Sequence, residues 1–244
     1  MTKHLNMEAL MQIKGFQKTT FIDYPNKVAS LVFTGGCNFR CPFCHNGGLV
    51  LNPNQYPTTL PETVFRHLEK RKGMIDGLVI TGGEPTLMQG LKAFIESVKA
   101  MDVSVKLDTN GTNPEVLQDL IESNLLDYIA MDIKHVFDKY PSAIGPSKVD
   151  MDKIKTSISL IIKSGVDHEF RTTVIKGMHT EDDVVQMTKY IKGARNYILQ
   201  QYVKTEGELM PNTFRSFTSE ELQNMIDNLD AKHGIKCFRV RGKY

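Results

Sequence analysis

The chain of 244 residues has little excess charge, no long apolar run and few cysteines. Lysine and arginine number 30 against 28 aspartate and glutamate residues, so the formal net charge is only +2. Nucleic-acid-binding proteins carry a basic footprint, and this balance therefore argues against a nucleic-acid partner. The apolar runs, such as residues 29–33, fall far short of the roughly 20 residues that cross a bilayer, so no membrane partner is expected.

The remaining composition is that of a globular protein. Apolar residues make up 41% and charged residues 24%, close to the averages for such chains, so the chain can bury a core. Its length allows one or two domains, and barrel-type α/β folds often occupy this length as one unit. The first residues mix Lys3, His4 and Glu8 among apolar ones and lack the apolar segment of a signal peptide. We therefore expect a cytoplasmic protein.

Only four cysteines are present, too few for a disulfide scaffold in a chain of this length. Three of them fall within residues 37–44, and such crowding indicates a metal site. The fourth, Cys237, lies in an apolar run and is expected to pack as a small apolar residue. Four histidines lack the spacing of a metal-binding pair and are expected at the surface or at helix caps: His67, His168, His179 and His233.

From residue 28 onward, short β-rich runs alternate with runs of helical period, which is typical of repeated β-α units on a parallel sheet. The predicted strands are 28–34, 77–81, 104–108, 128–133, 169–175 and 197–201, with a closing strand at 236–241. The predicted helices are 60–72, 91–101, 114–123, 151–164, 180–192 and 219–233. The pattern divides the chain into a lead-in over residues 1–27, irregular or hairpin-like from residue 12, and a β-α domain over residues 28–244.

The loop after the first of these strands offers three thiolates, from Cys37, Cys41 and Cys44. Cubane iron-sulfur clusters normally take four cysteines, so a three-cysteine loop leaves one iron open to a substrate or cofactor. The alternative is a structural zinc site with His45 as the fourth ligand. Structural zinc usually employs two ligand pairs from separate turns, and a histidine directly beside Cys44 suits that arrangement poorly.

Ligands collect at the carboxyl ends of parallel strands, and the next such end carries Gly82, Gly83 and Glu84. Two glycines let the backbone approach a ligand closely, and a fixed carbonyl together with Glu84 can receive an ammonium group. The alternative is an ordinary turn. The following strand ends at Asp108, ahead of an Asn-Gly pair that by itself only indicates a turn.

Two later strands carry charged residues among apolar neighbours. Asp132 and Lys134 are two residues apart and share one face of the strand, at the end where ligands bind. A solvated ion pair is the alternative. Arg171 can hold a carboxylate of a cofactor in bidentate fashion or contact substrate backbone, and a buried ion pair explains it equally well.

A Cys-x₃-Cys-x₂-Cys loop after the first strand of a β-α series resembles the radical S-adenosylmethionine (radical SAM) superfamily. The resemblance implies an α/β fold, a partial (β/α)₆ TIM-like barrel, in which the three cysteines bind a 4Fe-4S cluster. The open iron would be chelated by the amino and carboxylate groups of S-adenosyl-L-methionine. The expected cofactor contacts are Phe43, His45, Gly82, Gly83, Glu84, Asp108, Thr109, Asp132, Lys134 and Arg171. Asp108 and Asp132 could also form a monovalent-cation site.

Over most of residues 13–241 the chain resembles the activating enzymes of glycyl-radical enzymes, most closely those of anaerobic ribonucleotide reductase. The resemblance implies that a one-electron donor such as flavodoxin or ferredoxin reduces the cluster. A 5′-deoxyadenosyl radical from the cofactor would then take a hydrogen atom from a backbone glycine of the partner. The cofactor carries this chemistry, so no side chain is expected to act as a catalytic acid or base.

Three other functions stay open. The chain could activate a different glycyl-radical enzyme, of the pyruvate formate-lyase type. It could be a radical enzyme that acts on a small molecule and shares every motif above. A non-enzymatic zinc-binding module is the alternative from a different class. Iron and sulfide analysis of anaerobically prepared protein would separate the zinc module from the radical enzymes.

Overall fold

A computed structural model describes residues 11–233 and 238–241, and it divides them into two compact units. The first unit comprises, among the described residues, 11–38, 48–109 and 113–129. The second comprises 39–47, 110–112 and the described residues from 130 onward. The loop that carries the cysteines is therefore shared: Cys37 belongs to the first unit, whereas Cys41 and Cys44 belong to the second.

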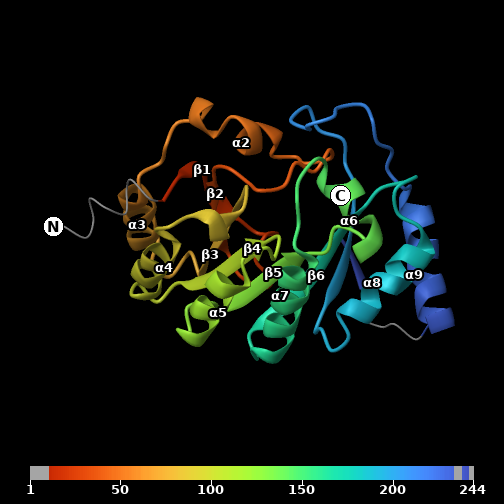
Figure 1. Cartoon of the computed structure of the whole chain (residues 1–244). Helices are drawn as coiled ribbons and strands as arrows, with labels where there is room; N and C mark the ends of the chain where they lie inside the picture. Colours follow the sequence, from red (N-terminus) through yellow and green to blue (C-terminus); the bar gives the residue numbers. More distant parts are fainter. Residues whose placement is uncertain (1–10, 234–237, 242–244) are drawn as a thin grey trace. The chain divides into compact units, whose positions relative to one another are not determined.

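The first unit is built on four neighbouring strands, ordered as they occur in the chain (Figure 1). They are β1 (Ile13–Thr20), β2 (Ala29–Thr34), β3 (Gly77–Gly82) and β4 (Ser104–Thr109). β1 runs antiparallel to β2, and the other pairs are parallel. The helical segments of this part of the chain are α2 (Gly47–Leu51), α3 (Pro61–Lys70), α4 (Leu91–Lys99) and α5 (Pro114–Glu122), with 3₁₀ turns η1 (Pro53–Gln55) and η2 (Pro85–Leu87).

Burial explains why these segments form strands and helices. Three consecutive residues of β3, Leu78–Ile80, are fully buried, as expected for a central parallel strand covered on both faces. The amphipathic helix α4 buries Phe94 and Ile95 on one side, while α3 and α5 begin with prolines whose fixed φ suits a first helical turn. Since β2, β3 and β4 are parallel, their carboxyl ends lie at one edge of the sheet.

The second unit contains the parallel strands β6 (Asp167–Val174), β7 (Tyr197–Gln201) and β8 (Phe238–Arg241). Its helices are α6 (Tyr140–Ile144), α7 (Met151–Lys163), α8 (Glu181–Tyr190) and α9 (Ser219–His233), with a 3₁₀ turn η3 (Phe137–Lys139). A capping box between Thr180 and Asp183 starts α8. Strand β5 (Tyr128–Asp132) gives its first two residues to the first unit and its last three to the second.

The predicted α/β class and all six β-α units are confirmed, with small shifts at the element ends. β6 begins at Asp167, two residues before the predicted start, because the chain is already extended there. The lead-in takes the hairpin alternative, since β1 pairs with β2. Of the predicted closing strand, residues 238–241 form β8, and Cys237 lies outside the described residues.

In the part of the chain that the structure describes, no helix has the length and apolarity needed to span a bilayer.

Candidate functional site

In the first unit, Gly82 at the end of β3 and the following Gly83 lie against the start of the cysteine loop. A Cβ atom on Gly83 would stand 1.7 Å from the carbonyl oxygen of Gly36, so no larger residue fits there. Gly82 has a φ of 117°, and a Cβ there would meet the backbone of Thr34. The Gly83 N–H donates to the Thr34 carbonyl and the Glu84 N–H to the Gly36 carbonyl, both at 2.9 Å. The Gly-Gly turn is therefore tied to the residues directly before Cys37.

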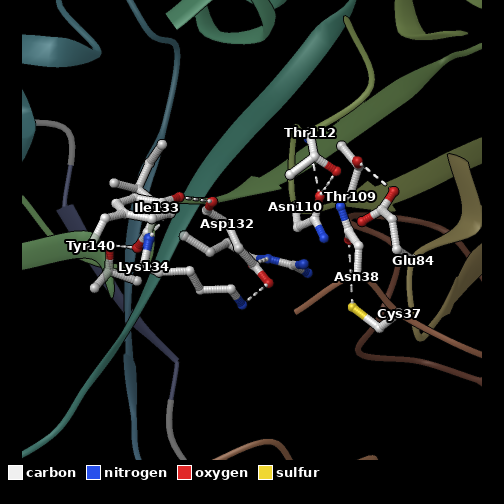
Figure 2. A network of polar contacts seen from close by, with 12 residues as sticks. Cys37, Asn38, Glu84, Thr109, Asn110, Thr112, Asp132, Ile133, Lys134 and Tyr140 are labelled. Atoms are coloured by element: carbon white, nitrogen blue, oxygen red, sulfur yellow. Dashed lines mark hydrogen bonds and ion pairs between the residues drawn. The ribbon is translucent and has the colours of Figure 1, made fainter. Parts of the chain in front are cut away.

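Glu84 lies at the base of this turn and is only 1% exposed. Its Oε1 accepts hydrogen bonds from the backbone N–H of Thr86 at 3.1 Å and from the Thr86 hydroxyl at 2.5 Å. The Thr109 hydroxyl donates to the same oxygen at 2.8 Å (Figure 2). The structure therefore brings together two of the predicted contacts, Glu84 and Thr109, and gives Glu84 a bracing role between the ends of β3 and β4. Contact with an ammonium group stays a prediction.

Asp108, at the end of β4, forms an ion pair with Lys106 over 2.5 Å. The Lys106 side chain is 1% exposed and also lies 5.9 Å from the centre of the Tyr128 ring. A buried ammonium group needs such compensation, so Asp108 balances a charge of its own strand. Asp108 and Asp132 each pair with a lysine of their own unit, Lys106 and Lys134 respectively. A monovalent-cation site formed by the two carboxylates stays a prediction.

In the second unit, Asp132 is held between two cations. Its Oδ2 accepts from Lys134 Nζ at 2.8 Å, and its Oδ1 accepts from Arg171 Nε at 2.9 Å. Figure 2 shows the Asp132–Lys134 pair. Burial would raise the pKa of the Asp132 carboxyl, but Arg171 and Lys134 outweigh it and hold that pKa well below its usual range. Burial would likewise lower the pKa of Lys134, and Asp132 instead raises it. All three side chains stay charged at neutral pH.

Cys41 is buried and Cys44 half-buried, and both thiols are free. The Cys44 N–H donates to the Cys41 carbonyl at 3.0 Å, which closes a tight turn between them. Burial raises the pKa of the Cys41 thiol to about 11, and the nearby charge of Lys134 opposes that shift. Burial also raises the pKa of Cys44. Metal binding deprotonates a thiol, so a cationic neighbour favours the ligand form of Cys41.

Phe43 and His45 belong to a group of aromatic rings in the second unit. The ring of Phe43 meets that of Phe214 edge-on, with centroids 6.1 Å apart, and His45 lies 6.2 Å from the ring of Tyr202. Tyr202 and Phe214 are also in contact. Sequence reasoning did not find Phe214 as a partner, because nothing in a local pattern links residues so far apart in the chain.

The prediction of surface positions is wrong for two histidines, His168 and His179, which are both 2% exposed. The ring of His179 lies tilted against that of His135, with centroids 4.6 Å apart, and His135 is itself 1% exposed. The Nδ1 of His179 accepts from the Ile175 N–H at 3.1 Å, and its Nε2 lies 3.0 Å from the Lys134 carbonyl. Burial lowers the pKa of His179 to about 4, so the ring is neutral and supports the backbone beside Lys134.

Cys37, Cys41 and Cys44 form no disulfide, and three thiols suit soft metals and iron-sulfur clusters by their donor chemistry. Among residues 11–229, whose side chains the structure describes, no group of three or more His, Cys, Asp or Glu is arranged to hold a metal ion.

Comparison with known proteins gives the following similarities. The family model of the radical SAM superfamily matches residues 31–191. A protein of Methanocaldococcus jannaschii, whose name assigns it to the glycyl-radical enzyme activating enzymes, is 37% identical over 80% of this chain and 81% of its own length. A protein of Pyrococcus horikoshii named as a GTP 3′,8-cyclase is 29% identical over 86% of this chain and 68% of its own.

Among solved structures, SuiB of Streptococcus suis bound to its precursor peptide SuiA matches with a TM-score of 0.69 and 13% identity. The match covers 88% of this chain but only 48% of SuiB, so the chain spans about half the length of that enzyme. At this identity the likeness concerns the fold alone, and it agrees with the α/β architecture that the strands and helices establish.

Proposed function

The chain belongs to the radical SAM superfamily, and from this premise we propose that it is an activating enzyme for a glycyl-radical enzyme. Membership brings the family's cofactors, a 4Fe-4S cluster and S-adenosyl-L-methionine. The observation that carries the finer proposal is the 37% identity to an activating enzyme along 81% of that relative's length. When bound, these cofactors supply one-electron cleavage of the sulfonium and hydrogen-atom abstraction from the substrate.

On this proposal Cys37, Cys41 and Cys44 hold the cluster through their thiolates. The donor set fits, since none of the three cysteines is in a disulfide and Lys134 favours the thiolate of Cys41. The Gly82–Gly83 turn keeps side chains away from the backbone that meets the cofactor, and Glu84 braces that turn. Phe43 and His45 are proposed to contact the cofactor from the cysteine loop itself.

The remaining proposed contacts are charged, except for Thr109, which is polar. Asp108, Thr109, Asp132, Lys134 and Arg171 stand at the ends or on the faces of β4, β5 and β6, or directly follow them. Among them, Arg171 and Lys134 are the cations suited to a carboxylate, and Asp132 fixes both in place through its two ion pairs. These residues are proposed to orient the cofactor and to neutralise its charge, and none of them needs to transfer a proton.

The partner is proposed to be a protein, most specifically anaerobic ribonucleotide reductase, with flavodoxin or ferredoxin as the electron donor. The resemblance of residues before and after the cysteine loop to activators of that reductase supports this choice. A pyruvate formate-lyase type of enzyme is the nearest alternative partner. Similarity to a GTP 3′,8-cyclase favours a second function, radical chemistry on a small molecule.

The test is anaerobic incubation of the cluster-loaded protein with S-adenosyl-L-methionine, a reductant and each candidate partner, read by electron paramagnetic resonance. A glycyl radical on ribonucleotide reductase is the expected result. Appearance of the radical only on another glycyl-radical enzyme would reassign the partner. Cofactor cleavage with GTP but no radical on any protein would favour the small-molecule function. The Cys41→Ala variant should fold but produce no 5′-deoxyadenosine.

A further inference from the structure

Within the second unit, residues 202–216 lie against the part of the cysteine loop that carries Cys41 and Cys44. Two backbone hydrogen bonds join them: the Gly47 N–H donates to the Gly207 carbonyl at 3.1 Å, and the Met210 N–H donates to the Pro42 carbonyl at 2.9 Å. The approach is close, since a Cβ on Gly47 would stand 2.5 Å from the Gly207 oxygen. The loop therefore has a backbone partner on both sides of Cys44.

Aromatic rings reinforce this contact. Phe214 packs edge-on against Phe43, and Tyr202 packs against His45, so both residues that flank Cys44 have a ring partner in residues 202–216. Tyr202 and Phe214 contact each other at 6.1 Å, which joins the two pairs into one group. Aromatic pairs in such tilted and edge-on arrangements add attraction beyond the area they bury.

One buried carboxylate holds the shape of residues 202–216. Glu208 is 7% exposed, and it accepts a hydrogen bond from the Tyr202 hydroxyl at 2.7 Å and one from the Thr205 N–H at 2.6 Å. Burial and Glu208 together raise the pKa of Tyr202 to about 12, so the phenol remains a donor. No lysine, arginine or histidine among the described residues forms an ion pair with Glu208, which leaves these two bonds as its compensation.

The far end of the same residues is anchored independently. The Ser216 hydroxyl donates to the Tyr202 carbonyl at 2.6 Å, and the Lys176 N–H donates to the Arg215 carbonyl at 3.0 Å. Residues 202–216 therefore form a closed loop whose ends are fixed, and whose turn depends on Tyr202 and Glu208. Loss of the hydrogen bond between Tyr202 and Glu208 should therefore loosen the turn that contacts Pro42 and Gly47, while the ends of residues 202–216 stay anchored.

We propose that Tyr202 and Glu208 are positioning residues for the cluster ligands. Their hydrogen bond keeps residues 202–216 in the shape that holds the cysteine loop, and so fixes the thiols of Cys41 and Cys44. This inference rests on the proposed function, in which those thiols bind the 4Fe-4S cluster. It adds two residues that act through the cysteine loop and are not cluster ligands.

The experiment compares Tyr202→Phe with Tyr197→Phe. The control loses a hydroxyl bond of the same 2.7 Å length, to Thr172, and its side chain is 0% exposed against 1% for Tyr202. Tyr197 begins β7 and its hydroxyl contacts Thr172 and Met187, whereas Tyr202 directly follows the end of β7 and contacts His45 of the cysteine loop. Thr172 keeps its second bond, to the Ile133 carbonyl.

Hydrogen exchange of the cluster-free protein and iron release to a chelator from the loaded protein are the readouts. In Tyr202→Phe, the Gly47 amide should exchange roughly fivefold faster and iron should leave several-fold faster, as expected for one hydrogen bond of about 1 kcal/mol. Tyr197→Phe should match the wild type in both. A shifted electron paramagnetic resonance spectrum of the reduced cluster is expected in Tyr202→Phe alone.

Glu208 variants test the same bond from its other side. Glu208→Gln can still accept from the Thr205 N–H and can donate to the Tyr202 oxygen, so it should behave nearly as wild type. Glu208→Ala removes the bonds from both Tyr202 and Thr205, so iron release and Gly47 exchange should be at least as fast as in Tyr202→Phe. Equal iron release and exchange in Tyr202→Phe and Tyr197→Phe would overturn the inference. A wild-type protein that takes up no iron-sulfur cluster would instead overturn the proposed function, and this inference with it.

Discussion

Gly83→Ala is the sharpest test of how the site is built in the first unit. The added methyl group would stand 1.7 Å from the Gly36 oxygen and 2.5 Å from the Gly36 carbonyl carbon. Both are backbone atoms, which cannot rotate away as a flexible side chain would. The turn after β3 and the chain before Cys37 must therefore separate by more than an ångström.

That separation breaks the two hydrogen bonds that join these segments, from Gly83 to Thr34 and from Glu84 to Gly36. Each is worth about 1 kcal/mol net, and overpacking adds a cost on the order of 1 kcal/mol or more. We expect the free energy of unfolding to fall by about 3 kcal/mol. Affinity for S-adenosyl-L-methionine should fall as well, since the displaced turn is a proposed cofactor contact.

Urea unfolding measures the first effect and equilibrium binding of the cofactor the second. The control is Gly73→Ala, also in the first unit, where nothing lies within 4 Å of the added methyl and φ is 78°. That control should cost only about 1 kcal/mol, the penalty of a left-handed backbone for alanine. If Gly83→Ala were as stable as Gly73→Ala, the close approach of the turn to the cysteine loop would be refuted.

Three further predictions concern charge in the second unit. Asp132→Asn should lower the free energy of unfolding by about 2 kcal/mol at pH 7, because Lys134 and Arg171 lose their half-buried partner. The pKa of Asp132 is lowered in the folded state, so its stabilising effect is present above about pH 4 and is lost as the pH falls below that value. Urea unfolding at several pH values should therefore show that the difference in free energy of unfolding between wild type and Asp132→Asn becomes smaller in acid. His179 has its pKa lowered from 6.5 to about 4, so wild-type stability should fall as pH drops through that window; His179→Gln, compared by thermal unfolding, should flatten the slope. Lys134→Met should raise the pKa of the Cys41 thiol further, because the nearby positive charge is lost. Alkylation of Cys41 in the cluster-free protein, followed by mass spectrometry near pH 9, should then be slower; an unchanged rate would remove Lys134 as its electrostatic partner.

Much of the fold could be predicted from the sequence because its elements are long and strongly patterned. Residues 77–81 are almost wholly apolar, and they form the buried strand β3. The helices over residues 140–144 and 47–51 were missed because five residues are too few to show a helical period. β1 was left open as irregular or hairpin, since Gly15 and three exposed residues obscure its alternation.

The candidate site shows the same division. Cys37, Cys41 and Cys44 could be predicted from their spacing in the sequence. The Gly-Gly-Glu turn could be predicted from its position after a strand. The partners of these residues could not be predicted. Phe214 contacts Phe43 across a long stretch of chain, and Glu208 resembles any surface glutamate until its burial is known. His179 was misjudged for that reason: its satisfied ring nitrogens depend on backbone groups that only the fold brings to it.

The loop that holds Cys41 and Cys44 has consequences for how the protein is made. Residues 39–47 belong to the second unit, where Arg40 donates to the Ile144 carbonyl and Gly47 to that of Gly207. During synthesis from the N-terminus, Cys41 and Cys44 are made before the residues that contact their loop, such as Ile144 and Gly207. Iron and sulfide can therefore meet the thiols in their final arrangement only after residues 202–216 have been synthesised. In a nascent or truncated chain that ends before Tyr202, the cysteine loop would lack its contacts with residues 202–216. Its thiols would then be exposed to oxidation before a cluster could assemble.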